Sequence, residues 1–476
     1  MWVVMKGYNR CYDIQQEAAS GDITLLPQKT NLIYQTSLIY CFNDEQSLYY
    51  IDKEFNFYAF HIPTQKNEFI ANLGKEIQER GKISSIVHYH NSYFVGFLMD
   101  GILLLEKQKE TDHYQIQSLP INSGVFCLKK DRFQDVVWIG TDGQGVYLYS
   151  NPLYSIKSMV LSNYTEKIER PVRAIYLDDE RTFWVGTKGN GILKIYDYEF
   201  DKNISDCRAE VLTTSNSALS SNAVYCFAKS HRNLLWIGDE EGLTYYSYRE
   251  KRIKSIPIRI GNEDFKYIHG IYETADSELW LASVGMGVVK ARIAGTPDNP
   301  VIVDAQRYII NDGELGSNYF FTIYAENEAN LLFGNKGYGV FRYNETTNGL
   351  EPVSTHKYEN MTLNNILAIS KDSSNNYLFG TSYGLIKYTS ETSYQLFNAK
   401  NGFLNNTIHA ILRNSSDDFW LSTNLGLINF DTKRNVFRSY GFGDGLKVVE
   451  FSDGAAFRDS QTGTLFFGAV SYTHLT

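Results

Sequence analysis

The chain has few of the residues that build chemical or membrane-spanning sites. It contains five cysteines among 476 residues, and no two of them are spaced as CxxC, so no zinc or redox motif is present. No apolar stretch is long enough for a membrane-spanning helix, and the opening MWVVMKGYNR does not resemble a secretory signal. No GxxxxGK[ST] motif occurs, which excludes the common phosphate-binding loop.

Basic residues are outnumbered and scattered. Lys and Arg total 45 against 54 Asp and Glu, a formal net charge of −9, and they form no cluster, which argues against nucleic acid as a partner. Nine prolines and the lack of low-complexity segments leave no long flexible linker. Cys127 and Cys226 occupy equivalent places in the repeat described next, which favours buried small residues over a disulfide.

Aromatic residues, in contrast, are abundant and recur at a regular interval. All six tryptophans begin the same short motif, as in Trp138-Ile-Gly-Thr and Trp184-Val-Gly-Thr. We call the aromatic residue that begins the motif its anchor. Successive anchors are 41 to 53 residues apart. The anchors are Trp2, Tyr49, Phe94, Trp138, Trp184, Trp236, Trp280, Phe333, Phe379, Trp420 and Phe467. A repeat of this length with aromatic and glycine marks is typical of a β-propeller.

Each repeat has the residues of four short antiparallel strands. An apolar run such as 172–176 comes first, and a polar turn such as 178–180 leads to the anchor on a second strand. A glycine pair, for example Gly189 and Gly191, then turns the chain into a third strand, and a more polar fourth strand completes the unit. The sequence therefore predicts an all-β fold of four-stranded blades. Because the anchors recur at one depth, we expect them to pack between blades and not to stack on ligands.

Eleven anchors exceed the usual four to eight blades of one propeller, so the pattern predicts tandem β-propellers. Residues 1–163 are expected to be the four C-terminal blades of a first propeller truncated at its start. Residues 164–470 are expected to be a second, seven-bladed propeller with an incomplete last blade, and 471–476 a non-native tail. The longer steps carry insertions at 198–217 and 294–312, which are candidates for a contact face.

Candidate ligand-binding residues lie at the ends of the predicted innermost strands, around one mouth of the second propeller. They are Arg173, Tyr225, His269, Tyr319, Asn364, Asn365 and His409. Such side chains can stack on sugar faces and hydrogen-bond hydroxyl groups or a carboxylate. The alternative is that they satisfy strand backbone or hold central waters. His88 and His90 are expected on one face of a strand, but with no third ligand nearby we predict no metal site and no cofactor.

The blades resemble two-component regulator propeller repeats. The segments 137–145 (VWIGTDGQG) and 183–191 (FWVGTKGNG) match the repeat pattern closely, and 169–179 resembles the entry into the second propeller of that family. The segment 444–451, followed by Ala455 and Gly463, resembles its closing blade. The resemblance covers essentially residues 1–470. Phenylalanine at 333 and 379 replaces the usual tryptophan.

The resemblance implies the periplasmic sensor region of a hybrid two-component system of the Bacteroidetes type. The expected ligand is a glycan-derived oligosaccharide that controls polysaccharide-utilisation genes. The parent histidine kinase would form a homodimer and reach the membrane only through a missing C-terminal segment. We expect no catalytic activity in this fragment. Two alternatives stay open: a propeller-borne carbohydrate-active hydrolase or lyase, with carboxylates meeting at the axis, and a protein-binding scaffold with an exposed apolar face.

Overall fold

The structure is a computed structural model of the whole chain. It describes residues 38–470 apart from 45, 109–112, 132–134, 151–155, 160, 162–167, 200–206, 311–317, 354–363, 391, 404 and 445. Before residue 38 it describes the backbone of three strands only. The side chain of the predicted anchor Trp2 and the predicted tail 471–476 thus lie outside the described residues.

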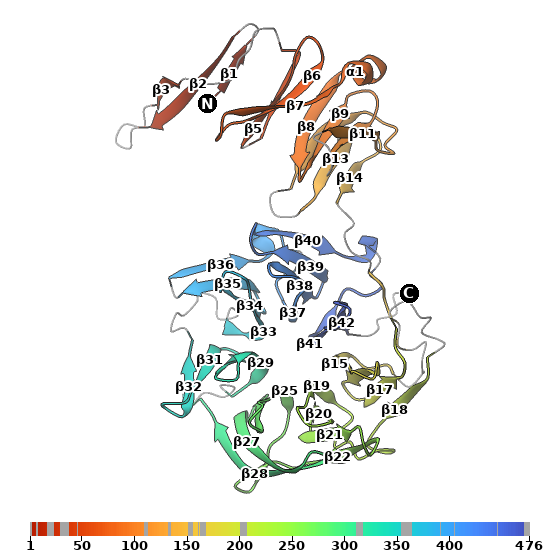
Figure 1. Cartoon of the computed structure of the whole chain (residues 1–476), viewed down its shortest axis with the longest axis vertical. Helices are drawn as coiled ribbons and strands as arrows, with labels where there is room; N and C mark the ends of the chain where they lie inside the picture. The colour runs from red at the N-terminus through yellow and green to blue at the C-terminus, as the bar shows by residue number, and fades with distance from the viewer. Residues whose placement is uncertain are drawn as a thin grey trace. The chain divides into compact units, whose positions relative to one another are not determined.

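The chain folds into two compact units, Met1–Leu153 and Tyr154–Thr476. This division comes earlier than the predicted limit between 163 and 164, and residues 162–167 at that limit lie outside the described part. The predicted domain limits therefore stay a prediction. Strands dominate both units, and every strand pairing among the described residues is antiparallel (Figure 1). The predicted all-β class with four-stranded propeller blades is confirmed.

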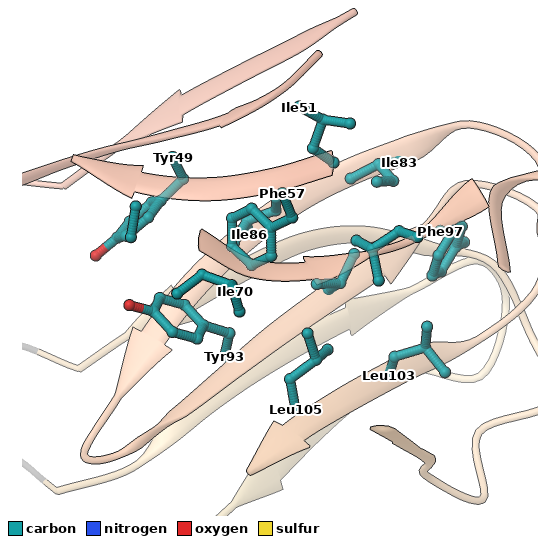
Figure 2. Packing of buried hydrophobic residues seen from close by; sticks show 13 residues of the cluster. Tyr49, Ile51, Phe57, Ile70, Ile83, Ile86, Tyr93, Phe97, Leu103 and Leu105 are labelled. Carbon is teal, nitrogen blue, oxygen red and sulfur yellow. The ribbon is translucent and has the colours of Figure 1, made fainter. Parts of the chain in front are cut away.

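The first unit contains four sheets whose strands follow one another in chain order. The first sheet consists of β1 (Trp2–Met5), β2 (Tyr8–Gln16) and β3 (Ile23–Gln28), and the second of β4 (Tyr40–Asn43), β5 (Ser47–Ile51), β6 (Asn56–His61) and β7 (Lys66–Asn72). The third sheet consists of β8 (Ile83–Tyr89), β9 (Ser92–Phe97), β10 (Ile102–Lys107) and β11 (Tyr114–Ser118). The fourth consists of β12 (Val125–Lys130), β13 (Val137–Thr141) and β14 (Val146–Tyr149). The helix α1 (Gly74–Arg80) joins the second sheet to the third. Side chains from these two sheets form one core, in which Tyr49, Phe57, Tyr93 and Phe97 are buried (Figure 2).

Among the described residues the second unit contains eight sheets, and seven of them, all except a short two-stranded one, are here called blades 1 to 7. Blade 1 consists of β15 (Val172–Leu177), β16 (Phe183–Thr187), β17 (Ile192–Ile195) and β18 (Ala209–Leu212), blade 2 of β19 (Val224–Lys229), β20 (Leu234–Asp239), β21 (Leu243–Ser247) and β22 (Arg252–Ser255), and blade 3 of β25 (Ile268–Glu273), β26 (Glu278–Ser283), β27 (Gly287–Thr296) and β28 (Asn299–Tyr308). Blade 4 consists of β29 (Phe320–Asn327), β30 (Asn330–Asn335), β31 (Gly339–Asn344) and β32 (Gly349–Pro352), and blade 5 of β33 (Ile366–Lys371), β34 (Tyr377–Thr381), β35 (Gly384–Ser390) and β36 (Ser393–Phe397). Blade 6 consists of β37 (Ala410–Arg413), β38 (Asp418–Thr423), β39 (Gly426–Asp431) and β40 (Val436–Tyr440), and blade 7 of β41 (Phe451–Arg458) and β42 (Leu465–Ala469).

Three short elements lie between these blades. The two-stranded hairpin of β23 (Arg259–Ile260) and β24 (Glu263–Asp264) follows blade 2. Two 3-10 helices, Ala399–Asn401 and Phe442–Asp444, flank blade 6. The predicted insertion at 294–312 is largely the extension of β27 and β28 into a long hairpin, which explains the longer repeat there.

The seven blades form a closed ring around an axis lined by their first strands (Figure 1). Each first strand contacts the next one, from β15 to β41, and β41 contacts β15 again. Blades 7 and 1 share a hydrophobic cluster that includes Val172, Phe183, Ala455 and Phe466. Blade 7 has two strands among the described residues, and this shared cluster joins it to blade 1.

The aromatic anchors lie on the second strands and are mostly buried. Trp184 and Trp236 have no exposed surface, and each shares a cluster with apolar residues of the following blade. The indole nitrogen of Trp184 donates to Oδ2 of Asp178 at 2.9 Å, so the polar turn before the second strand satisfies the buried N–H group. Trp138, in the last sheet of the first unit, differs in being 36% exposed.

A glycine near the end of the second strand, such as Gly186 in blade 1 and Gly468 in blade 7, is required by the ring. A Cβ atom on Gly186 would lie 2.8 Å from Cγ1 of Val224, the first residue of the next blade's inner strand. At Gly468 in blade 7 the same atom would lie 2.5 Å from Cγ1 of Val172 in blade 1. Adjacent blades therefore approach more closely than any side chain at this position allows.

Candidate functional site

A β-bulge near the start of the first strand recurs from blade to blade in the second unit. In β15 the pairing with β16 jumps from Val172 to Ala174, so the residue between them is unpaired. A bulge residue leaves the ladder, and its side chain is re-aimed relative to its neighbours. The bulge residues of blades 1 to 5 are Arg173, Tyr225, His269, Phe321 and Leu367. Because the first strands line the axis, the five bulges form a ring around it.

Blades 6 and 7 add two charged or polar side chains to this ring. His409 precedes β37, and its backbone N–H donates to the carbonyl of Ser422 at 2.8 Å. In β41 a longer irregularity between Phe451 and Ala456 carries Asp453 out of the ladder. Nδ1 of His409 lies 2.5 Å from Oδ1 of Asp453, and Nε2 lies 2.7 Å from Oδ1 of Asn424. We call the side chains at these seven positions the axial ring. Its members are Arg173, Tyr225, His269, Phe321, Leu367, His409 and Asp453.

Arg173 lies beside Asp453 without forming a hydrogen bond to it. Nη1 of Arg173 is 3.6 Å from Oδ2 of Asp453, and the Arg173 side chain is 17% exposed. Its Nε atom is buried and has no hydrogen-bond partner among the described residues. A buried N–H donor without an acceptor is costly, so a polar group from solvent or a ligand is favoured at this position.

The aromatic side chains of the axial ring contact one another. Tyr225 and His269 stack with ring centroids 4.2 Å apart and an interplanar angle of 16°. Phe321 meets His269 edge-on, with centroids 5.8 Å apart and planes at 90°. All three residues keep part of their surface exposed, so blades 2 to 4 present a continuous aromatic arc.

The electrostatics show that side chains from non-adjacent blades lie close together. Burial and, to a smaller extent, the Arg173 charge lower the pKa of His269 to about 3, so the imidazole is neutral at physiological pH. Burial alone would raise the pKa of Asp453, but the hydrogen bond from His409 and the charges of His409 and Arg173 outweigh it and hold this pKa below its usual range. Asp453 is therefore ionised at neutral pH.

The axial ring thus has two chemically different halves. Blades 6, 7 and 1 contribute His409, Asp453 and Arg173, whereas blades 2 to 4 contribute the aromatic arc. Leu367 of blade 5 is buried and completes the circle. Such an arrangement suits a molecule with one flat apolar face and several polar substituents.

Four of the seven sequence-predicted site residues lie together in the axial ring, and three do not. Arg173, Tyr225, His269 and His409 are members. The other three are Tyr319, Asn364 and Asn365. They precede the ring residues Phe321 and Leu367 by two or three positions.

Tyr319 and Asn364 instead hold turns of neighbouring blades. The Tyr319 ring lies against the turn glycine Gly285, where a Cβ atom would be 3.4 Å away. The Asn364 carbonyl accepts a hydrogen bond from the backbone N–H of Gly337 at 3.2 Å. Asn365 is half-buried between Asn364 and β33. A role in ligand binding stays a prediction for all seven residues.

Sequence reasoning missed four residues of this region, namely Phe321, Leu367, Asp453 and Asn424. A signal for the first two is present, since each bulge residue stands between a large apolar residue and a small one, as in Val172-Arg-Ala174. Asp453 had no such signal, because the longer irregularity in β41 shifts it out of the repeat. Asn424 follows β38 and contacts the ring only through the fold.

The predicted pair His88 and His90 does not lie on one face of a strand. β8 ends at Tyr89, and His90 turns out of it with a positive φ of 53°. Nε2 of His90 is 2.8 Å from Oδ2 of Asp135, whereas His88 stacks against Tyr93. Across the described residues no group of three or more His, Cys, Asp or Glu is arranged to hold a metal ion. The four cysteines of the described part are free.

Comparisons with known proteins establish the fold. The chain matches no family model and no curated protein. Two solved structures with a similar fold are extracellular domains of proteins assigned as hybrid two-component systems of B. thetaiotaomicron. The first is 20% identical with a TM-score of 0.52, and the match covers 98% of this chain and 65% of that one. The second is 17% identical with a TM-score of 0.51, covering 97% and 61%.

The chain thus spans less than two thirds of the length of these extracellular domains. Fold and axial ring together define it as a β-propeller protein with a polar and aromatic site at its axis. None of the helices in the described ranges is long and apolar enough to cross a membrane.

Proposed function

We propose that the chain is the ligand-sensing extracytoplasmic region of a hybrid two-component sensor histidine kinase. In this proposal residues 1–163 are the last four blades of a first propeller and residues 164–470 form a seven-bladed second one. The region lies in the periplasm, carries no catalytic activity and binds a glycan-derived oligosaccharide. Support comes from the shared fold with extracellular domains of two-component systems and from the motifs of the blades.

The axial ring is the observation that carries the sugar-binding part of the proposal. Tyr225 is stacked on His269 through one face, and its other face can pack against the C–H face of a sugar ring. Beside it, Arg173, Asp453 and His409 supply donors and acceptors for hydroxyl groups. Flat stacking surfaces next to convergent polar groups are typical of small-ligand sites.

Signal transmission would follow from a shift in populations. A bound oligosaccharide stabilises one arrangement of a homodimer of the parent protein, and the kinase responds to that arrangement and switches on polysaccharide-utilisation genes. The ligand must bind one arrangement more tightly than the other for this to work.

A thermal-shift screen against glycan-derived oligosaccharides tests the proposal. A ligand of the folded state stabilises it by about 2.7 kcal/mol at a hundred times its Kd, so the melting temperature rises with ligand concentration. We expect the rise in the wild-type chain and in Tyr394→Ala, an exposed tyrosine on β36, but not in Tyr225→Ala. The sugar is recovered and analysed by chromatography.

Each other outcome points to a different function. Cleaved sugar would show a propeller-borne hydrolase or lyase. A rise that persists in Tyr225→Ala would place the site away from the axial ring. The lack of a rise with every glycan would count against a sugar sensor and favour a protein-binding scaffold.

A further inference from the structure

We infer that the axial ring selects an acidic sugar, and that Arg173 binds its carboxylate or sulfate group. This inference rests on the proposed function and adds the chemical class of the ligand. It concerns the anionic group alone and leaves open which backbone of sugar residues carries it.

The first argument is the unused hydrogen-bonding capacity of Arg173. A guanidinium group has five N–H donors in a planar fork. Among the described residues the Nε donor of Arg173 has no hydrogen-bond partner, and Nη1 forms a long ion pair of 3.6 Å with Oδ2 of Asp453. Its Nε atom is fully buried and the side chain is only 17% exposed, so solvent reaches little of it. Planar anions with two oxygens match this fork, because two parallel N–H···O bonds form at once.

The second argument is that Asp453 meets Arg173 only in a long ion pair, because its carboxylate is held mainly by His409. Its Oδ1 atom is held by Nδ1 of His409 at 2.5 Å, and its Oδ2 atom stays 3.6 Å from Arg173. Because the His409 ring is itself fixed by Asn424 at 2.7 Å, the carboxylate is anchored toward blade 6. Arg173 therefore keeps a face for a second anion.

The third argument is the position of Arg173 between the two halves of the axial ring. In ring order Asp453 lies on one side, whereas Tyr225 and then His269 lie on the other. A sugar ring stacked on the face of Tyr225 that is turned away from His269 would place a substituent near Arg173, whose charge acts on Tyr225. The charge of Lys188, in the turn after β16, also acts on His269, and the buried His269 ring itself stays uncharged. Two cations of blade 1 thus face the aromatic arc.

Apart from Asp453, the negative groups near the ring lie on the blade 2 side. Asp239 at the end of β20 and Glu240 in the turn that follows act on Tyr225, and Oε2 of Glu240 accepts a hydrogen bond from Ser221 at 3.4 Å. Their negative charges repel an anionic ligand, which is therefore favoured on the blade 1 side of the aromatic arc. The hydroxyl groups of a neutral sugar accept single hydrogen bonds from Arg173, whereas a carboxylate or sulfate accepts stronger charge-assisted ones, so a neutral sugar gains less from this site than an acidic one.

The test compares pairs of sugars that differ only in the anionic group. Tetragalacturonate is compared with its methyl ester, and N-acetylglucosamine 6-sulfate with N-acetylglucosamine, by calorimetric titration of the whole chain at constant ionic strength. We expect the acidic member of one pair to bind at least about tenfold more tightly than its neutral counterpart. This ratio corresponds to a difference in binding free energy of about 1.4 kcal/mol. The carboxylate and sulfate pairs tell the two sources of the anion apart.

Variants of Arg173 assign the effect to the axial ring. Arg173→Gln is expected to remove the preference for the acidic member, whereas Arg173→Lys keeps the charge and retains part of it. Arg249→Gln changes an arginine that is 75% exposed, and binding should be unaltered. The melting temperature of each variant without sugar shows whether it is folded, and Arg173→Lys carries the test if Arg173→Gln does not fold.

The outcomes separate this inference from the proposed function. Equal binding of the acidic and neutral members, or an acidic preference that survives in folded Arg173→Gln, overturns the inference and leaves a sugar sensor in place. Binding of neutral glycans alone does the same. If neither acidic nor neutral sugars bind in the titration or the wider glycan screen, both proposals fail.

Discussion

Some residues of the second unit cannot be replaced by larger ones without a clash, and the repeating contact between blades explains why. Gly238 follows Trp236 on β20, where a Cβ atom would lie 2.5 Å from Sγ of Cys226 and 2.8 Å from the carbonyl oxygen of Ile268. The second contact is with backbone of the next blade, which cannot rotate away. Glycine is thus required by the neighbouring blade, because its backbone here needs no positive φ.

Gly238→Ala is therefore expected to destabilise the second unit by about 1–3 kcal/mol, the usual cost of overpacking. Gly441→Ala is the matched control, since nothing lies within 4 Å of a Cβ atom there and its φ is not positive. The urea midpoints of both variants and the wild type give the comparison. Equal midpoints for the two variants would contradict the packing argument.

Asp239 is a second residue with a predictable effect. It is buried at the end of β20 and accepts hydrogen bonds from Ser220 at 2.6 Å and from the backbone of Gly242 at 3.0 Å. Burial raises its pKa to about 6, although these hydrogen bonds oppose the shift. Because the unfolded pKa is about 3.9, the folded state holds the proton more tightly, and stability falls as pH rises from about 4 to about 6.

We expect Asp239→Asn to remove this fall and to be more stable than the wild type above about pH 7, by about 2 kcal/mol. Asparagine fits, because Asn335 ends the equivalent second strand of blade 4 and is also buried. Asp179→Asn is the control, since that side chain is 71% exposed. The measurement is urea unfolding at several pH values, and parallel pH profiles of wild type and Asp239→Asn would refute the assignment.

At the scale of the element, backbone and amide groups link one blade to the next. The carbonyl of Asn222, at the entry to blade 2, accepts hydrogen bonds from Gly189 at 3.0 Å and Gly191 at 2.8 Å in blade 1. Its side-chain oxygen accepts from the backbone N–H of Thr214 at 2.9 Å. Asn318 is equivalent, with bonds from Gly285 and Ile310. The inner strand of each of these blades is thus held by the turn of the preceding one.

Asn222→Ala removes the side-chain acceptor and should lower stability by about 1 kcal/mol, the value of one ordinary hydrogen bond. Asn365→Ala is the partner variant, because the Asn365 side chain has no such role and its removal should change stability by less than about 0.5 kcal/mol. Thermal unfolding of the two variants tests this. A greater loss from Asn365→Ala would show a structural role for that residue.

Element position also explains what could be inferred from the sequence and what could not. The anchors and the turn glycines are local features, and they predicted the strands of nearly every blade. The bulge is invisible to a count of repeat spacing, because one unpaired residue changes the pairing and not the length. Tyr319 and Asn364 were therefore selected in place of Phe321 and Leu367.

At the scale of the whole second unit, closure of the ring joins residues that are far apart in the chain. Arg181 of blade 1 and Asp459 of blade 7 form an ion pair of 2.8 Å, and the Asp459 side chain is only 6% exposed. Burial would raise the pKa of Asp459, but the hydrogen bonds from Arg181 and Thr462 outweigh it, so this pKa is lowered. The ion pair is therefore present throughout the neutral range.

Arg181→Ala leaves a buried carboxylate without its cation and should destabilise the ring by about 1–3 kcal/mol. Since the folded pKa of Asp459 is below the unfolded one, this contribution is complete above about pH 4 and is lost as pH falls further. Arg249→Ala, which breaks an ion pair whose arginine is 75% exposed, should cost less than about 1 kcal/mol. Urea midpoints at neutral and acidic pH check both expectations, which equal losses in the two variants would contradict.

The sequence by itself determined the all-β class and the blade as the unit of structure. These follow from short-range periodicity, which each blade repeats within its own residues. Only the tertiary structure decided which side chains meet at the axis. Arg173 lies more than two hundred residues before His409 and Asp453 in the chain, and it meets them because the ring closes. Contacts across a closed ring depend on how the strands curve and on irregularities such as the one that carries Asp453 out of the ladder, and neither follows from the repeat spacing.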